Sequence, residues 1–337
     1  MEDAEDRMVE KVQTLSDIEL AVLLSLITDH HCIIEAIPES LDDVTHEIRL
    51  IASNTFGLTS AVLDCSEATN LDEFGTGILV EDGREDSSSS GDNRMIANIV
   101  VAKNLNKAIP LVQVQALELM RGKRNYTRTA VHAAPKPFVF IALNASGSIR
   151  LSTHLNDQFC ISHKHLEEHG LPNLEELQDT EFVSEDDASS SSVVRSPPVV
   201  YQKQKKNILF STEDLHELSS LINDVKISSE VRAYLHNIIV FMRLHRAVRG
   251  GISAMATRHF NTLARALAPL HGLTYITPSL VALAARKIYP HRIIITAPSH
   301  ERSMQWGSSL EAVKAVLDGV TVEDVIEEVL QSVEAPL

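Results

Sequence analysis

The sequence predicts two folded parts, an α/β part built on a parallel sheet and a second part that is entirely helical. Up to residue 178, short apolar runs typical of strands alternate with amphipathic helical stretches. From residue 206 onward, the apolar residues repeat at the helical period. The segment between the two parts is acidic and rich in serine, a composition typical of a linker.

The first part begins with a helical stretch at residues 15–29 and continues as alternating strands and helices. Runs 98–102 and 137–144 are apolar without a break, which is typical of strands covered on both faces. The other predicted elements are strands at 32–34 and 61–65 and helices at 44–55 and 111–121. This alternation predicts a parallel sheet with helices on both faces.

The second part has several helix start signals. Ser211 is followed by an acidic residue at Asp214, a spacing similar to a capping box. Thr277 and Pro278 provide a capping hydroxyl followed by a proline at the first helical position. The amphipathic helical stretches lie at 229–246 and 256–270, with two more between 307 and 333.

Composition indicates an ordinary globular chain of 337 residues, with 44% hydrophobic residues and a mean hydropathy of −0.01. No apolar run reaches the length of about 18 residues that a membrane helix needs. The N-terminal stretch MEDAEDRMVE has neither the basic nor the apolar region of a secretory signal. Cys32, Cys65 and Cys160 lie far apart, which favours reduced thiols over a disulfide framework. We therefore expect a cytoplasmic or nuclear protein without membrane partners.

The segment from 231 to 293 resembles the helical lid of AAA+ proteins of the group that contains MoxR and the magnesium-chelatase I subunit. These lids carry a G-x-S-P-R-A turn, an A-R-A-L-A helix, a G-R-x-Y-V-T-P segment and a closing H-R. The corresponding residues here are Gly251–Ala256, Ala264–Ala268, Gly272–Pro278 and His291-Arg292.

The resemblance continues through the first part. Cys65–Gly75 looks like the segment that leads to the second helix insert of this group. NIVVAKNLNKAIP (98–110) is similar to its N-I-L-L-A-D-E-I-N-R-A-P strand, and QVQALELM (113–120) to its Q-x-A-L-L-E-A-M helix. LNDQF (155–159) is similar to its L-L-D-R-F. The resemblance implies an AAA+ core at 1–178 with an acidic insert at 81–93, a mobile acidic linker at 179–205, a lid at 206–300 and C-terminal helices at 301–337.

The resemblance also implies where a nucleotide site would lie, and the residues at those positions are unusual. In an active relative, P-loop amides and a lysine cradle the phosphates while a hydroxyl helps to hold magnesium. The P-loop positions here are Ala36, Glu39, Leu41, Asp42 and Asp43. Lys103 and Asn104 occupy the Walker B position, Gln158 the arginine-finger position, Met255 the second-sensor position and Asn144 the first-sensor position. Of these, only Asn144 matches the residue type of an active relative.

These replacements predict a non-catalytic AAA+ pseudo-ATPase that acts as an interaction, regulatory or scaffold subunit. No cofactor is expected for such a protein. The alternative is an ATPase subunit of a complex like magnesium chelatase or of a MoxR-like chaperone, which would use ATP and Mg²⁺ for metal insertion or remodelling.

A histidine-rich stretch offers a different chemistry. Cys160, His163, His165 and His169 lie within ten residues of one another and are all possible zinc ligands. Their spacing matches no familiar zinc finger or ribbon, so we expect a partly exposed histidine-rich edge and no metal site.

Charge is distributed unevenly along the chain. Between residues 231 and 300 there are nine Lys and Arg residues and no Asp or Glu, although the chain as a whole has a net charge of −16. We expect this basic surface, with Arg243, Arg246 and Arg249, to bind an acidic protein partner or the acidic core of a second copy. The alternative is that these side chains only solvate helix faces. Nucleic acid is a less favoured partner because the rest of the chain would repel a polyanion.

Overall fold

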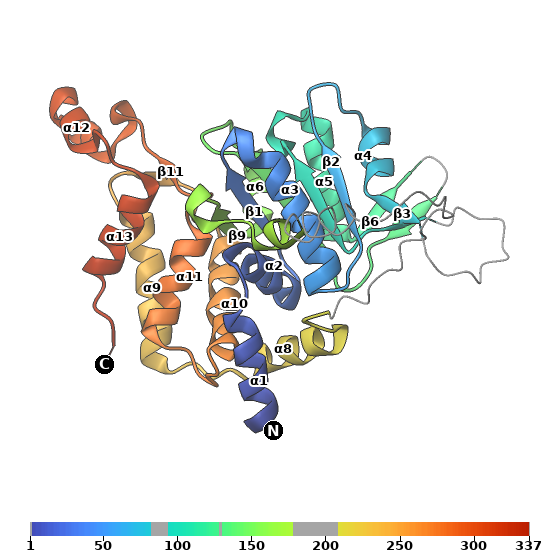
Figure 1. Cartoon of the computed structure of the whole chain (residues 1–337). Helices are drawn as coiled ribbons and strands as arrows, with labels where there is room; N and C mark the ends of the chain where they lie inside the picture. The colour runs from blue at the N-terminus through green and yellow to red at the C-terminus, as the bar shows by residue number, and fades with distance from the viewer. Residues whose placement is uncertain (1, 82–93, 128–129, 178–207, 337) are drawn as a thin grey trace, which may run out of the picture.

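The computed structural model describes residues 2–81, 94–127, 130–177 and 208–336. The predicted acidic insert at 81–93, apart from Glu81, and the predicted linker at 179–205 lie outside these residues. The main sheet has five parallel strands in the order β2–β5–β8–β1–β9 (Figure 1). The strands are β1 (His31–Ala36), β2 (Ser60–Asp64), β5 (Ile99–Lys103), β8 (Val139–Ala145) and β9 (Phe159–Lys164).

Helices cover both faces of this sheet, as predicted. The helices α2 (Asp17–Thr28) and α3 (Leu41–Leu50) contact it on one face, while α4 (Leu71–Gly77), α5 (Pro110–Gly122) and α6 (Thr153–Gln158) contribute to a second hydrophobic cluster. Neighbouring strand residues alternate between the two clusters, as Val100 and Val101 do, because successive side chains of a strand point to opposite faces.

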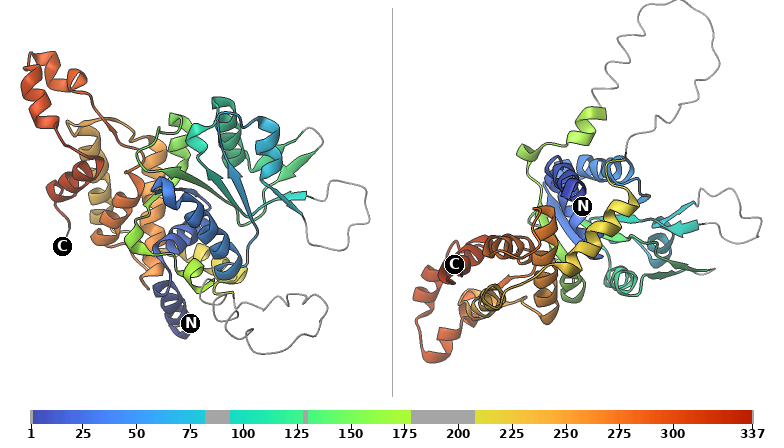
Figure 2. Two further views of the ribbon diagram at one scale, coloured as in Figure 1. Left: turned by 45° about the horizontal axis from the view of Figure 1, so that its top comes forward. Right: turned by 90° about the horizontal axis from the view of Figure 1, so that it is seen from below.

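Two short hairpins extend the core at the edge away from the lid (Figure 2). In the first, β3 (Leu79–Glu81) pairs with β4 (Arg94–Ile96), and the acidic insert connects these strands. In the second, β6 (Arg124–Tyr126) pairs with β7 (Val131–Ala133).

The lid consists of helices and one small sheet. The helices are α8 (Thr212–Asp224), α9 (Ser229–Leu244), α10 (Ala254–Leu270) and α11 (Pro278–Ile288), followed by α12 (Leu310–Leu317) and α13 (Val322–Ser332). The predicted capping box at Ser211 and Asp214 is confirmed. The prediction of an entirely helical second part is wrong in one detail, because the lid also contains a small antiparallel sheet. In it, β10 (Val248–Gly250), which precedes α10, pairs with β11 (Ile294–Ile295), which follows α11.

The lid packs directly on the core. Helix α10 contacts α2 and β9, α11 contacts β9, and α8 contacts α2. One hydrophobic cluster therefore extends from the sheet through α2 into the lid helices. Helix α1 (Glu2–Gln13), which the sequence did not predict, lies beside α8 and contacts α10, and Lys11 forms a 2.9 Å ion pair with Asp214 (Figure 1).

One predicted boundary is wrong. The helix expected at 44–55 begins at Leu41 and gives way to a π-helical turn at Ile51–Thr55. The start at Leu41 matters for function, because it places Asp42 and Asp43 in the first turn of α3, at the carboxyl end of β1.

Candidate functional site

The position of a nucleotide site follows from the topology. In open parallel sheets, ligands bind beyond the carboxyl ends of the strands. Strand β1 lies between β8 and β9 and ends at Ala36, whose register partner in β8 is Ala145. The segment from Ile37 to Ser40 then leads into α3, so this segment occupies the place of a P-loop.

The backbone of this segment does not have the form of a phosphate cradle. Such cradles need successive N–H groups in a concave arrangement, which glycines make possible. Pro38–Ser40 instead forms a single 3₁₀ turn in which Pro38 has no N–H, and no residue from 36 to 43 has a positive φ. Leu41 is buried in the main hydrophobic cluster, so the side chain at this glycine position helps to fix the loop.

The most distinctive feature of the site is an ion pair of reversed polarity. Lys103 Nζ lies 2.5 Å from Asp42 Oδ1 and 3.3 Å from Asp64 Oδ2. The hydrogen bond to Asp42 is the main reason that the pKa of Lys103 is raised. The resemblance assigns a lysine to the position of Asp42 and an aspartate to the position of Lys103, so the structure contains the same two charges with their positions exchanged.

Three exposed carboxylates surround the start of α3. Glu39 lies in the preceding turn, and Asp42 and Asp43 lie in the first helical turn. A helix N-terminus favours negative charge, which bound phosphates supply in an active P-loop. Here the carboxylates of Asp42 and Asp43 supply negative charge at the N-terminus of α3.

Two asparagines lie at the ends of β5 and β8, the strands that follow one another in the sheet beside β1. Asn104 has a left-handed backbone with φ 54° and donates a 3.3 Å hydrogen bond from Nδ2 to Asp64. Asn144 is buried, and its Oδ1 has no hydrogen-bond partner among the described residues. Its register partner in β1 is Glu35, whose pKa is raised by burial. Both residues line a cavity of about 230 Å³ that reaches Glu323 at the start of α13.

The structure does not bring Gln158 and Met255 to this site. Gln158 directly precedes β9, whose first residue Phe159 is paired with His31 at the opposite end of β1 from Ala36. Five residues of strand separate these ends by roughly 16 Å. Met255 lies in the first turn of α10, where the neighbouring Ser253 donates a 2.7 Å hydrogen bond to Asp157.

Asp157 also anchors the connection between core and lid. Arg292 forms an ion pair with Asp157, donates to the Phe159 carbonyl at 2.5 Å and contacts His259 Nδ1 at 2.7 Å. Its side chain is 1% exposed. Burial lowers the pKa of His259 to about 2, so this histidine is neutral beside the guanidinium.

Some of the basic residues of the lid pair with acidic residues, which the sequence did not indicate. Arg246 lies 3.9 Å from Glu301, and Arg286 pairs with Glu327 at 2.5 Å, so acidic residues beyond 300 neutralise part of it. Arg243 is exposed but donates to the Ile252 carbonyl. Arg249 is exposed and, within the part of the chain that the structure describes, forms no ion pair. Together with Arg243 it lines a cavity of about 570 Å³ between α6 and the lid.

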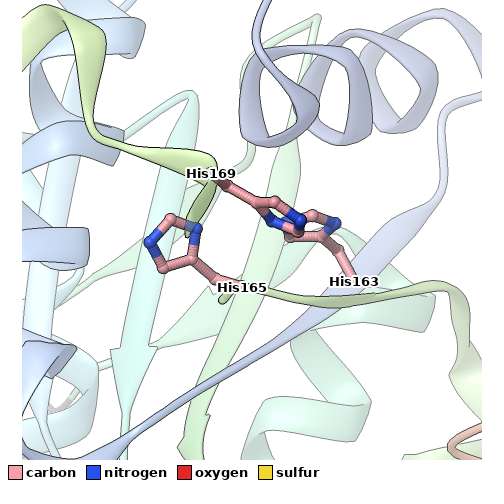
Figure 3. Close-up of side chains that lie close together, drawn as sticks. All are labelled: His163, His165 and His169. Carbon is pink, nitrogen blue, oxygen red and sulfur yellow. The ribbon is translucent and has the colours of Figure 1, made fainter. Parts of the chain in front are cut away.

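The histidine-rich stretch is more compact than expected. His163, His165 and His169 each place a ring nitrogen within 4.8 Å of the others, whereas Cys160 is not part of this group (Figure 3). The expectation of a partly exposed edge is wrong for His163 and His165, which are buried, and holds for His169.

Comparisons with known proteins agree with this fold. Residues 240–312 match the family described as AAA lid domain. The chaperone MoxR1 of Mycobacterium tuberculosis is 22% identical, over 94% of this chain and 77% of that protein. The uncharacterized protein YeaC of Bacillus subtilis is 21% identical, over 95% of this chain and 90% of its own length.

A fungal relative is more similar over a shorter region. Maintenance of telomere capping protein 2 of Lachancea thermotolerans is 30% identical over 116 residues, which is 33% of this chain and 41% of that protein. The match therefore spans less than half of that relative.

The solved structure of a candidate ATPase from Cytophaga hutchinsonii superposes with a TM-score of 0.65 at 18% identity, covering 99% of this chain and 94% of that one. No helix among the described residues is both long and apolar enough to cross a membrane. The fold is thus that of an AAA+ protein, a P-loop NTPase-like core followed by a helical lid, and the comparisons support a MoxR-like relationship.

Proposed function

We propose that this protein is a non-catalytic AAA+ module, a pseudo-ATPase that acts as an interaction or scaffold subunit. The observation that carries this proposal is the Asp42–Lys103 ion pair at the carboxyl end of the sheet. In this arrangement the two charges that would bind phosphate and magnesium bind each other instead.

Electrostatics favours this proposal over weak nucleotide binding. Two like unit charges at 4 Å repel by about 4 kcal/mol at an effective dielectric constant of 20. A triphosphate at the start of α3 would meet Glu39, Asp42 and Asp43 with no lysine from the loop. Lys103 is already engaged with Asp42 and Asp64.

The alternative is an active ATPase of the kind expected for a MoxR-like chaperone. Its support is the overall fold together with the polar side chain of Asn144 at the end of β8. We rank it second because it would have to bind Mg²⁺ and phosphate without a loop lysine, a loop glycine or a Walker B carboxylate.

Calorimetric titration of the full chain with Mg-ATP distinguishes the two. At protein concentrations able to detect a Kd of about 100 μM, or about −5.5 kcal/mol, we expect no saturable heat. The Asp42→Lys/Lys103→Asp variant is the matched comparison, because it restores both charges to the positions implied by the resemblance while keeping the ion pair. Saturable heat with the natural sequence, or phosphate release abolished by Asn144→Ala, would contradict the proposal.

For the partner, we propose an acidic protein surface, with the acidic core of a second copy as the first candidate. Arg249 supports this best, since it is exposed and unpaired among the described residues. Sedimentation at rising salt tests it: self-association should weaken as the Debye length falls from about 10 Å at 0.1 M to about 3 Å at 1 M.

The name of the fungal relatives suggests telomere-cap maintenance as the process in which to look for other partners.

A further inference from the structure

We infer that His163, His165 and His169 form a binding site for a zinc ion, at the edge of the sheet beside the lid. The site lies at the end of β9, which is the strand next to β1, and the His165 N–H donates to the Glu35 carbonyl there. The inference does not depend on whether the protein is a pseudo-ATPase.

The first support is the way the fold gathers the three rings. His163 lies on β9 and His165 directly follows the last residue of that strand, where its backbone N–H still donates to the Glu35 carbonyl of β1. The two side chains, two residues apart, therefore lie on the same face of the chain. The chain then turns back through the 3₁₀ turn Glu167–His169, which brings the third ring onto the same face (Figure 3). The ring centroids are 5.9–6.4 Å apart, and the three candidate ligand atoms lie within 4.8 Å of one another.

The second support is that two of the ring nitrogens are buried without a hydrogen-bond partner in the part of the chain that the structure describes. His163 is 2% exposed and His165 is 5% exposed. His163 Nε2 and His165 Nδ1 are buried without a hydrogen-bond partner among the described residues. A buried polar atom in this state destabilises the folded chain, and a metal ion would satisfy both nitrogens.

The protonation states suit metal binding. A histidine ligand must be neutral. Burial lowers the pKa of His163 to about 4 and lowers the pKa of His165 as well. Lys287 contributes to the low pKa of His163, whereas Asp17 acts in the opposite direction on both rings. Both histidines are therefore available as ligands at neutral pH.

The donor set selects the kind of metal. Imidazole nitrogens suit zinc and its transition-metal neighbours, whereas Ca²⁺ and Mg²⁺ prefer oxygen ligands. Zinc bound by nitrogen at about 2.0–2.1 Å would require the three rings to move together by about 1 Å. His169 can make most of this movement, because it is exposed and lies in a turn. Three protein ligands leave a fourth position for water or another ligand.

Cys160 does not belong to this site. It lies three residues before His163, about 10 Å along the strand, and is fully buried in the main hydrophobic cluster. Burial also raises the pKa of its thiol to about 12. The ligand set is therefore three histidines rather than a cysteine with histidines.

The test is zinc titration of the tag-free full chain after chelator treatment, with a chromophoric chelator as competitor. We expect one Zn²⁺ per chain with a Kd of about 1 μM or tighter, and a rise in melting temperature on zinc addition. His169→Ala should weaken binding at least tenfold and remove the thermal shift, and it should leave the metal-free fold intact because His169 is exposed.

The matched control is His216→Ala, which removes an exposed histidine on α8 and should bind zinc like the natural sequence. His165→Ala should also abolish binding, and His169→Ala keeps the test decisive if that buried variant does not fold. Absence of stoichiometric binding, or equal affinity in His169→Ala and the natural sequence, would overturn the inference.

Discussion

Two aspartates of this protein pair with basic residues far away in the sequence, and the two regions differ in almost every other respect. Asp42 meets Lys103 at the carboxyl end of the sheet, where the Asp42 side chain is 85% exposed. Asp157 meets Arg292 at the junction of core and lid, where the Arg292 side chain is 1% exposed. The first region is where the resemblance expects a nucleotide, and the second is where the lid is attached.

The difference shows how burial decides what an ion pair does. An exposed pair contributes about 0–1 kcal/mol to stability, because water screens it. Breaking a buried pair costs about 3–5 kcal/mol, since it leaves a charge without a partner in a nonpolar environment. The Asp42 side chain can therefore be replaced with little effect on folding, whereas the Arg292 side chain cannot.

The largest effect that would test this comparison is expected at the junction. Arg292→Ala should lower the free energy of unfolding by about 3–5 kcal/mol, because it removes the partner of Asp157 and a donor to the Phe159 carbonyl. Urea denaturation at neutral pH measures it. Arg249→Ala is the matched control, an exposed arginine on the same part of the lid, and should change stability by less than about 0.5 kcal/mol. Equal effects from both substitutions would remove the distinction between the two regions.

A smaller effect on the free energy of unfolding is expected at a glycine of the same junction. Gly251 has φ 104°, and a Cβ atom there would lie 1.9 Å from the Arg292 carbonyl oxygen. Gly251→Ala should therefore cost about 2–3 kcal/mol.

Gly250 provides the control for that substitution. A Cβ atom at Gly250 would meet nothing within 4 Å, so Gly250→Ala should have little effect on the melting temperature. If both alanine variants melt like the natural sequence, the close approach of lid turn and Arg292 does not limit stability.

The smallest effect is expected at the nucleotide position. A double-mutant cycle of Asp42→Ala and Lys103→Ala should give a coupling energy below about 1 kcal/mol. Added salt should reduce this coupling further, because the pair is solvent-exposed at Asp42. A coupling of several kcal/mol that persists at high salt would mean that the pair is a structural element like the junction.

The sequence by itself determined the local elements, because hydrophobic periodicity and capping residues act over a few residues. The unbroken apolar runs at 98–102 and 137–144 correspond to the central strands β5 and β8, and Ser211 does cap α8. The order of motifs also predicted the α/β core and helical lid, which the fold confirms. Short strands β10 and β11 escaped prediction because their pairing joins segments more than forty residues apart.

Only the tertiary structure decided which of these residues meet. Asp42 and Lys103 are 61 positions apart, and the parallel crossovers of the sheet bring them within 2.5 Å. The same strand order separates Gln158 from Asp42, because β9 begins at the end of the sheet where β1 begins and Asp42 follows the end where β1 finishes. The spacing of His163 and His165 was visible in the sequence, but the turn that adds His169 was not. Periodicity specifies which face of an element is buried, whereas strand order and packing specify which distant side chains share that burial.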